Sequence, residues 1–158
     1  MSIKSDWEDI IYRGRITASY KFALAETLLE VANDNKKSIS LKDMGKIYTN
    51  KLIRHLRVYP KQITAKSSKF LEACMDYDNG KISEDELSEI TLNMGFKNVL
   101  SRFHNLGEFK VKTRYYKVFK GSLYLTEEMI ELVQNEGYNN LMTMVESRWN
   151  EVEESWNG

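Results

Sequence analysis

The sequence predicts a mainly α-helical fold that contains a winged helix-turn-helix-like unit and one small β-hairpin. Three observations predict this fold. Apolar residues recur at the three- and four-residue spacing of amphipathic helices over most of the chain. Serine or threonine precedes several of these stretches in the pattern of a helix N-cap. Residues 109–115 alternate between uncharged and basic side chains, which is the period of a strand.

The 158 residues have the length of a single domain, within which two parts can be distinguished. The first, residues 1–60, is expected to be helical. Residues 18–33 carry two apolar stripes, so this helix is expected to be buried on two sides. A second helix is expected to begin after Ser40, where Asp43 completes a cap signature, and to end before Pro60.

The second part, residues 66–126, contains the winged helix-turn-helix-like unit. The predicted elements are, in order, a helix over 67–77, a helix with a capping box of Ser83 and Glu86 that Gly95 ends, a short helix over 97–105, and a hairpin with strands 109–115 and 123–125 around a turn at Lys120-Gly121. In such a unit the second helix of the pair enters the major groove of DNA. The hairpin, or wing, lies along the phosphate backbone.

Helices over residues 127–156 follow, and Thr126 is expected to cap the first of them. The last helix, residues 139–156, carries an apolar seam at spacings of three and four residues. The seam consists of Met142, Val145, Trp149, Val152 and Trp156. It requires a partner, either within the chain or in a second copy, so a homodimer through this helix is one expectation.

The composition excludes several classes of function. A single cysteine, Cys74, excludes an intrachain disulfide, fits a reducing compartment and lies in an apolar run typical of a buried thiol. With only two histidines far apart in sequence, no metal-binding cluster is expected, and no glycine-rich phosphate loop occurs. We therefore expect no catalytic site, no metal and no cofactor in this chain. No apolar stretch has the roughly 20 residues of a membrane span, which predicts a cytoplasmic protein.

The net charge of zero conceals zones of opposite sign. Residues 42–69 hold eight basic side chains and one acidic one, and residues 109–120 hold five basic side chains and no acidic one. Such zones are typical of phosphate-binding surfaces, although the first could equally be a solvated face paired with acidic residues in the fold. The residues expected to contact double-stranded DNA are Lys97, Asn98, Ser101, Arg102 and Asn105 on the recognition helix, Lys110, Lys112, Arg114, Lys117 and Lys120 on the wing, and Lys51, Arg54 and Arg57 in the first zone.

Different roles are expected within this set. Asn98, Arg102 and Asn105 are of the types that read base edges, whereas the wing lysines and arginine would contact phosphates. His55, flanked by arginines, is interpreted as part of the basic surface. His104, close to apolar residues, is interpreted as a packed or helix-capping histidine.

Several ordered stretches together resemble a known family. They are YKFALAETLLEVA (20–32), the helix start at 40–43, SKFLEACMDY (68–77), GKISEDEL (80–87), MGFKNVLSRFHNL (94–106), LYLTEEMIEL (123–132) and ESRWNEVEESW (146–156). They resemble the N-terminal, non-catalytic region that precedes the nuclease domain of bacterial HNH endonucleases of the restriction or defence type. The resemblance covers about residues 7 to 156.

The resemblance implies a DNA-binding or target-recognition module. The paired histidines and asparagine of the HNH nuclease motif do not occur here, so the chain is not expected to be an enzyme itself. We expect either a fragment of a longer nuclease or a relative without the nuclease domain. Two alternatives stay open: a protein-interaction or dimerisation module, and a stand-alone winged-helix transcriptional regulator.

Overall fold

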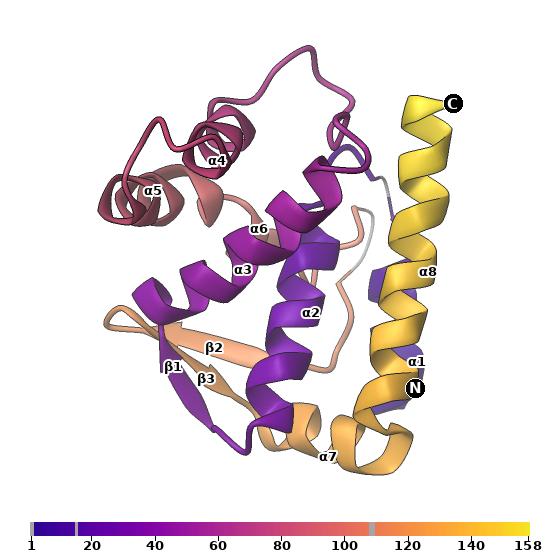
Figure 1. The fold of residues 1–158 in the computed structure, drawn as a ribbon. Coiled ribbons are helices and arrows are strands. Elements are labelled where there is room, and N and C mark those ends of the chain that lie inside the picture. The colour runs from indigo at the N-terminus through magenta and orange to yellow at the C-terminus, as the bar shows by residue number, and fades with distance from the viewer. Residues whose placement is uncertain (1, 15, 108–109) are drawn as a thin grey trace.

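The computed structural model describes residues 2–14, 16–107 and 110–158. It is mainly helical, with a small three-stranded antiparallel sheet at one end (Figure 1), which confirms the predicted fold class at that level. The elements are α1 (Ile3–Tyr12), α2 (Tyr20–Asn33), β1 (Ser38–Ser40), α3 (Leu41–Leu56), α4 (Lys69–Asp78), α5 (Glu84–Ile90), the π-helical turn η1 (Thr91–Gly95), α6 (Val99–Arg102), β2 (Tyr116–Phe119), β3 (Ser122–Leu125), α7 (Glu127–Glu136) and α8 (Tyr138–Asn157).

Helix α2 is the central element of the core. It packs against α3 on one side and α8 on the other (Figure 1), so its two apolar stripes are both covered, as predicted. Leu24 and Leu28 are fully buried. Full burial of a leucine side chain contributes roughly 1.5–3 kcal/mol to folding. The helix therefore fixes where α3 and α8 lie relative to each other.

Three helices begin at the residues that the sequence predicted, and each has a side-chain N-cap. The Ser40 hydroxyl accepts from the Asp43 backbone amide at 3.1 Å at the start of α3. Ser83 and Glu86 form the full capping box of α5, and Thr126 caps α7. Each such cap stabilises a helix by about 1 kcal/mol.

The sheet has the strand order β1-β3-β2, with both pairs antiparallel. Ile39 of β1 pairs with Leu123 of β3, and Val118 of β2 pairs with Leu123 from the other side. β1 comes from the predicted first part of the chain, and the hairpin comes from the second. One sheet therefore joins the two parts.

Of the strand predicted over 109–115, residue 109 lies outside the described residues, and for residues 110–115 the prediction is wrong, because β2 begins at Tyr116. The predicted alternation of burial is nevertheless present in the part that the structure describes: Val111 and Tyr115 are buried and the basic residues between them are exposed. The backbone amides of this stretch find partners elsewhere. Thr113 donates from its amide and its hydroxyl to Asp6 of α1, at 3.1 and 2.6 Å, and the Tyr115 amide donates to His104.

The predicted recognition helix over 97–105 is also wrong in length, because α6 comprises a single turn, Val99–Arg102. The helix before it ends in the turn η1, as the position of Gly95 predicted. Gly95 packs against Phe70 so closely that a Cβ added there would lie 2.7 Å from the ring. Its carbonyl accepts a hydrogen bond from the Tyr48 hydroxyl at 3.2 Å.

The apolar seam of α8 has its partner within the chain. Val145, Trp149 and Val152 are buried against the core. The Trp149 ring stacks on His55 of α3, with ring centroids 3.4 Å apart, and its indole N–H donates to Gln62 at 2.9 Å. The seam therefore leaves little apolar surface for a second copy. Among the described residues, no helix is long and apolar enough to span a membrane.

Candidate functional site

The residues expected on the recognition helix are exposed and lie on or beside α6. Lys97, Asn98, Ser101, Arg102 and Asn105 all reach solvent. Three of them, Asn98, Arg102 and Asn105, line one hollow of about 260 Å³, whose other wall includes the start of α2. The structure thus brings the three expected base-reading side chains together. It does so around a hollow and not along an extended helix face.

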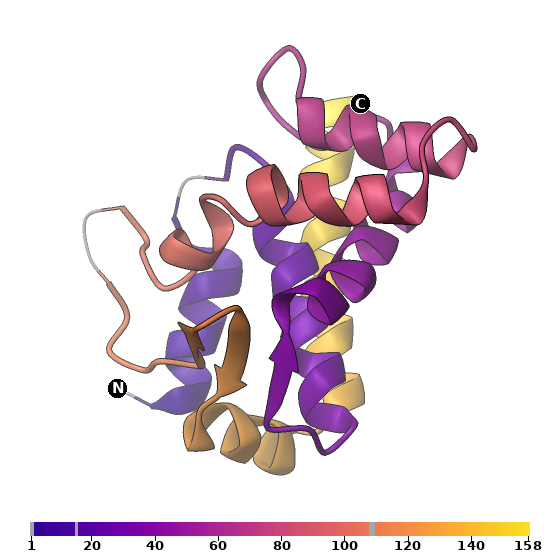
Figure 2. The same ribbon diagram turned by 90° about the vertical axis from the view of Figure 1, so that its left-hand side faces the viewer.

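Five basic side chains follow in the extended stretch and the hairpin, and we call them the basic segment: Lys110, Lys112, Arg114, Lys117 and Lys120. All five are exposed. None forms an ion pair with a residue that the structure describes. Figure 2 shows α6, the extended stretch and the hairpin on one side of the molecule. On this side of the molecule, no acidic group in the described part of the chain lies within ion-pair distance of these five cations.

Two aromatic side chains are exposed beside the basic segment. Phe119 at the end of β2 is 62% exposed and Tyr124 of β3 is 45% exposed. The Lys120 ammonium lies 5.3 Å from the centre of the Phe119 ring. Tyr124 pairs with Lys117 across the hairpin. Exposed aromatic rings next to cations are the combination that stacks on nucleic-acid bases while the cations bind phosphates.

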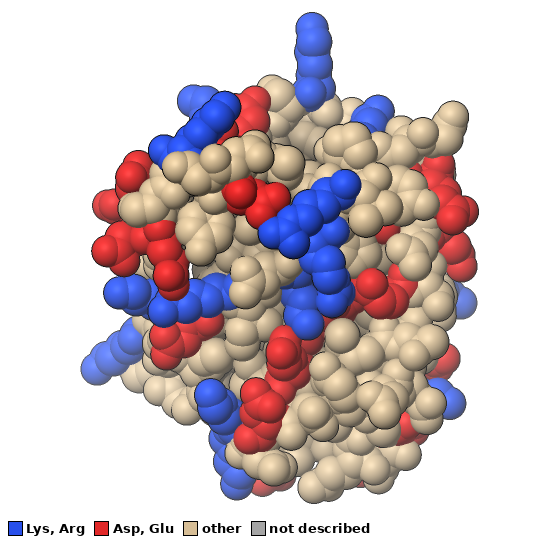
Figure 3. All heavy atoms as spheres, viewed as in Figure 1, with Lys and Arg blue, Asp and Glu red and all other residues tan. Residues whose placement is uncertain are grey.

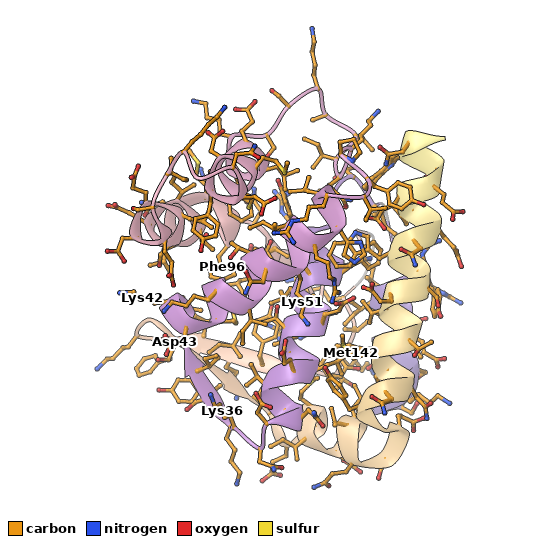
Figure 4. All side chains as sticks on the ribbon, in the orientation of Figure 1. Lys36, Lys42, Asp43, Lys51, Phe96 and Met142 are labelled. Carbon is orange, nitrogen blue, oxygen red and sulfur yellow. The ribbon has the colours of Figure 1, made fainter. Side chains whose placement is uncertain are left out.

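The basic residues of α3 are in a different situation. Lys51 pairs with Glu30 at 3.0 Å, Arg54 pairs with Glu26 at 3.3 Å, and Arg57 donates to the Asp78 carboxylate. Figure 3 shows basic and acidic side chains interleaved across the face that α3 crosses, and Figure 4 labels Lys42 at the start of this helix and Lys51 farther along it. Four of the eight cations of the first basic zone, residues 42–69, are therefore paired within the fold: Lys46, Lys51, Arg54 and Arg57. The other four, Lys42, Lys61, Lys66 and Lys69, form no ion pair with a residue that the structure describes.

The prediction that His55 joins the basic surface is wrong. Its side chain is buried between two carboxylates, with Nδ1 2.8 Å from Glu153 and Nε2 2.9 Å from Glu146. Glu26 of α2 completes the group, because one donor atom from each of Glu26, His55 and Glu146 lies within 4.8 Å of the others. We call these residues, with Glu153, the buried carboxylate–histidine cluster.

The ionisable groups of the cluster have pKa values that are shifted from their ordinary values. Burial, together with the adjacent Glu146 carboxylate, raises the pKa of Glu26 to about 9. Burial opposes ionisation of Glu146, but hydrogen bonds with His55 and Glu26 outweigh it and lower the pKa of Glu146 to about 2. Burial likewise opposes the charge on His55, yet hydrogen bonds to Glu146 and Glu153 raise the pKa of His55. At neutral pH a protonated Glu26 therefore faces an ionised Glu146, and the neighbouring carboxylates favour the charged form of His55.

No local pattern in the sequence pointed to this cluster. Glu26, His55 and Glu146 come from three helices that are far apart in the chain. No short spacing motif links them, and only the packing of α2 between α3 and α8 brings them together.

Cys74 and His104 are both packed inside the protein, as the sequence predicted. Cys74 is buried, and burial raises the pKa of its thiol to about 12, so the thiolate form that makes a cysteine nucleophilic is suppressed. His104 is packed against Phe103 and Tyr116 and accepts a hydrogen bond from the Tyr115 amide at 3.0 Å.

No family model, curated protein or solved structure gives a significant match to this chain.

Proposed function

We propose that this chain binds double-stranded DNA through the basic segment and acts as the target-recognition module of an HNH-type restriction or defence endonuclease. The observation that carries the proposal is the contrast between the basic segment and the cations along α3 and at its C-terminal end. Lys51, Arg54 and Arg57 are paired there with Glu30, Glu146 and Asp78. The basic segment has no such partners among the described residues, so its charges can displace counterions from a phosphate backbone.

The arrangement of the sheet supports the same proposal. The strand order β1-β3-β2 places a short strand between two helices, α2 and α3, beside a two-stranded hairpin. This order is compatible with a winged helix in which β2 and β3 form the wing. Lys117 and Lys120 then lie on the wing, where contacts to phosphates are expected.

Base reading is assigned to the residues around α6. Asn98, Arg102 and Asn105 line one hollow beside α6, and the ribbon of Figure 2 shows α6 on the same side as the hairpin. Arginine can pair with guanine and asparagine with adenine through two hydrogen bonds each. Because α6 has only one turn, these residues would read few base pairs, and the basic segment would supply most of the affinity.

The association with an HNH nuclease rests on the sequence resemblance. No catalytic group is assigned within this chain, so the proposed contribution is binding and not cleavage. A stand-alone transcriptional regulator would bind DNA through the same surface. A dimerisation module has less support, because the central residues of the apolar seam of α8 are buried against the core of the same chain.

A binding titration with matched variants tests the proposal. A fluorescently labelled duplex is titrated at low salt with the wild-type chain and with a variant in which Lys110, Lys112 and Arg114 are changed to alanine. All three side chains are exposed, so the variant is expected to remain folded. It should bind DNA at least ~10-fold more weakly, because three phosphate contacts are removed.

The control variant removes the same charge from the opposite end of the molecule. Lys61, Lys66 and Lys69 are exposed in and after the loop between α3 and α4, which lies away from the sheet (Figure 1). Changing these three to alanine should leave affinity almost unchanged. Equal losses in both variants would show that only net charge matters and would contradict the proposed interface.

A further inference from the structure

The buried carboxylate–histidine cluster is not used by the proposed DNA-binding surface. It lies where α2, α3 and α8 meet, and each helix contributes one donor group: Glu26, His55 and Glu146. A hollow of about 220 Å³ lined by His55, Glu146, Arg54 and Asn150 connects this place to solvent. Glu146 is 35% exposed at the mouth, whereas the Glu26 side chain is fully buried.

The orientation of His55 resembles that of a metal ligand. Its Nδ1 faces Glu153 at 2.8 Å, and Glu153 is itself held by the Gln62 amide at 2.6 Å. A metal-binding histidine typically donates its second ring N–H to a carboxylate in this way, which fixes the ring and directs the other nitrogen at the ion. Stacking on Trp149 fixes the ring plane further. Nε2 therefore points at Glu146, 2.9 Å away, and one donor atom of Glu26 lies within 4.8 Å of this pair.

A second, independent observation concerns unsatisfied oxygens. No described N–H or hydroxyl group donates to the buried Oε2 of Glu26. The Glu26 carboxyl hydrogen-bonds with Glu146, which requires either a proton on Glu26 or, in its place, a cation between the two carboxylates. A buried carboxyl oxygen that receives no hydrogen bond from an N–H or hydroxyl group destabilises the fold. Among the described residues, the one ion-pair contact of Glu26 is with Arg54, at 3.3 Å from the other oxygen, and the Arg54 side chain is half exposed. The two facing carboxyls therefore offer oxygen donors that a cation could share in place of the proton.

We propose that Glu26, His55 Nε2 and Glu146 bind a divalent transition-metal ion. One imidazole nitrogen and two carboxylates suit Zn²⁺ or Mn²⁺ better than Mg²⁺ or Ca²⁺, which prefer oxygen donors alone. Donor atoms within 4.8 Å of one another can close on an ion about 2 Å from each with small side-chain shifts. The ion would displace the proton on Nε2 and the proton on Glu26, both of which would pass to solvent. Arg54 would swing toward solvent, and α2, α3 and α8 would be linked through one centre.

This site is separate from the proposed DNA surface, so the test does not use DNA. Tag-free, metal-stripped protein is titrated with Co²⁺, and binding is followed by the visible absorption of the bound ion; Zn²⁺ and Mn²⁺ are then added as competitors. We expect saturation at one ion per chain. Zn²⁺ should also raise the thermal unfolding temperature, because an ion that binds only the folded state stabilises it.

Two conservative variants keep the test independent of folding. Glu26→Gln preserves the size of the buried side chain, and Glu146→Gln changes a partly exposed one. Each should weaken Co²⁺ binding by at least ~100-fold, because even outer-sphere changes weaken metal binding 10–100-fold. The same variants should retain the far-ultraviolet circular dichroism of the wild type.

Glu151→Gln, on the exposed side of α8, is the matched control and should bind as the wild type does. The proposal is overturned if the wild type shows no saturable binding of Co²⁺, Zn²⁺ or Mn²⁺. It is equally overturned if Glu26→Gln and Glu146→Gln bind as tightly as Glu151→Gln, since the ion would then lie elsewhere.

Discussion

His104 and His55 show how two buried histidines of one chain come to have opposite properties. His104 is surrounded by aromatic rings and accepts one hydrogen bond from a backbone amide. Burial, with a smaller effect of Arg114, lowers the pKa of His104 to about 4. His55 lies between Glu146 and Glu153, which raise its pKa. The sequence predicted the packed His104 from its apolar neighbours, but the carboxylates around His55 come from distant residues.

The depressed pKa of His104 predicts a pH dependence of stability. His104 takes up a proton near pH 6.5 in the unfolded chain and only near pH 4 in the folded chain. The contribution of neutral His104 to the free energy of unfolding is therefore fully present above pH 6.5 and is lost as the pH falls toward 4. The difference in pKa corresponds to roughly 3 kcal/mol. Urea unfolding of the wild type at pH 7 and pH 4.5 measures the loss. A His104→Gln variant should lose clearly less over the same interval, and an identical loss would contradict the assignment.

A second prediction at this scale concerns Gly95. A methyl group at this position would meet the Phe70 ring at 2.7 Å. Gly95→Ala should therefore destabilise the fold by about 1–3 kcal/mol, the usual effect of overpacking a core. Chemical unfolding measures the effect. An unchanged midpoint would show that α4 and η1 are packed less tightly than described.

At the scale of elements, local signals determined what the sequence could predict. Ser40, Ser83 and Thr126 marked three helix starts correctly, because a cap depends on residues only three apart. Strand pairing has no such local signal. The stretch 111–115 has the alternation of a strand, but its amides bond to Asp6 and His104, so the ladder begins only at Tyr116.

The hairpin carries its own prediction. Phe119 is exposed at the end of β2 and contacts Lys120, so it contributes little to the core and is available to a ligand. Phe119→Ala should leave the unfolding free energy within about 0.5 kcal/mol of the wild type. If this ring stacks on DNA, the same change should weaken duplex binding by about 1–3 kcal/mol. An unchanged affinity for the duplex would show that the Phe119 ring does not contact DNA.

At the scale of the whole molecule, contacts between distant residues decide both the fold and the sites. β1 joins the hairpin through a pairing that spans more than 80 residues, and the buried carboxylate–histidine cluster spans three helices. Neither could be predicted from spacing. The basic segment could be, because its charges are contiguous in sequence and stay exposed in the fold. By contrast, the first basic zone was ambiguous in the sequence, and the pairing of four of its cations with acidic residues became visible only in the structure.

The central claim, that this chain binds duplex DNA through unneutralised charge, is tested most directly by the salt dependence of binding. The affinity of the wild-type chain for a labelled duplex is measured from about 50 to 200 mM salt. Binding should weaken linearly on a logarithmic scale, with a slope of about −4 to −5 if all five cations of the basic segment contact phosphates. Absence of binding at the lowest salt, or binding independent of salt, would contradict the claim.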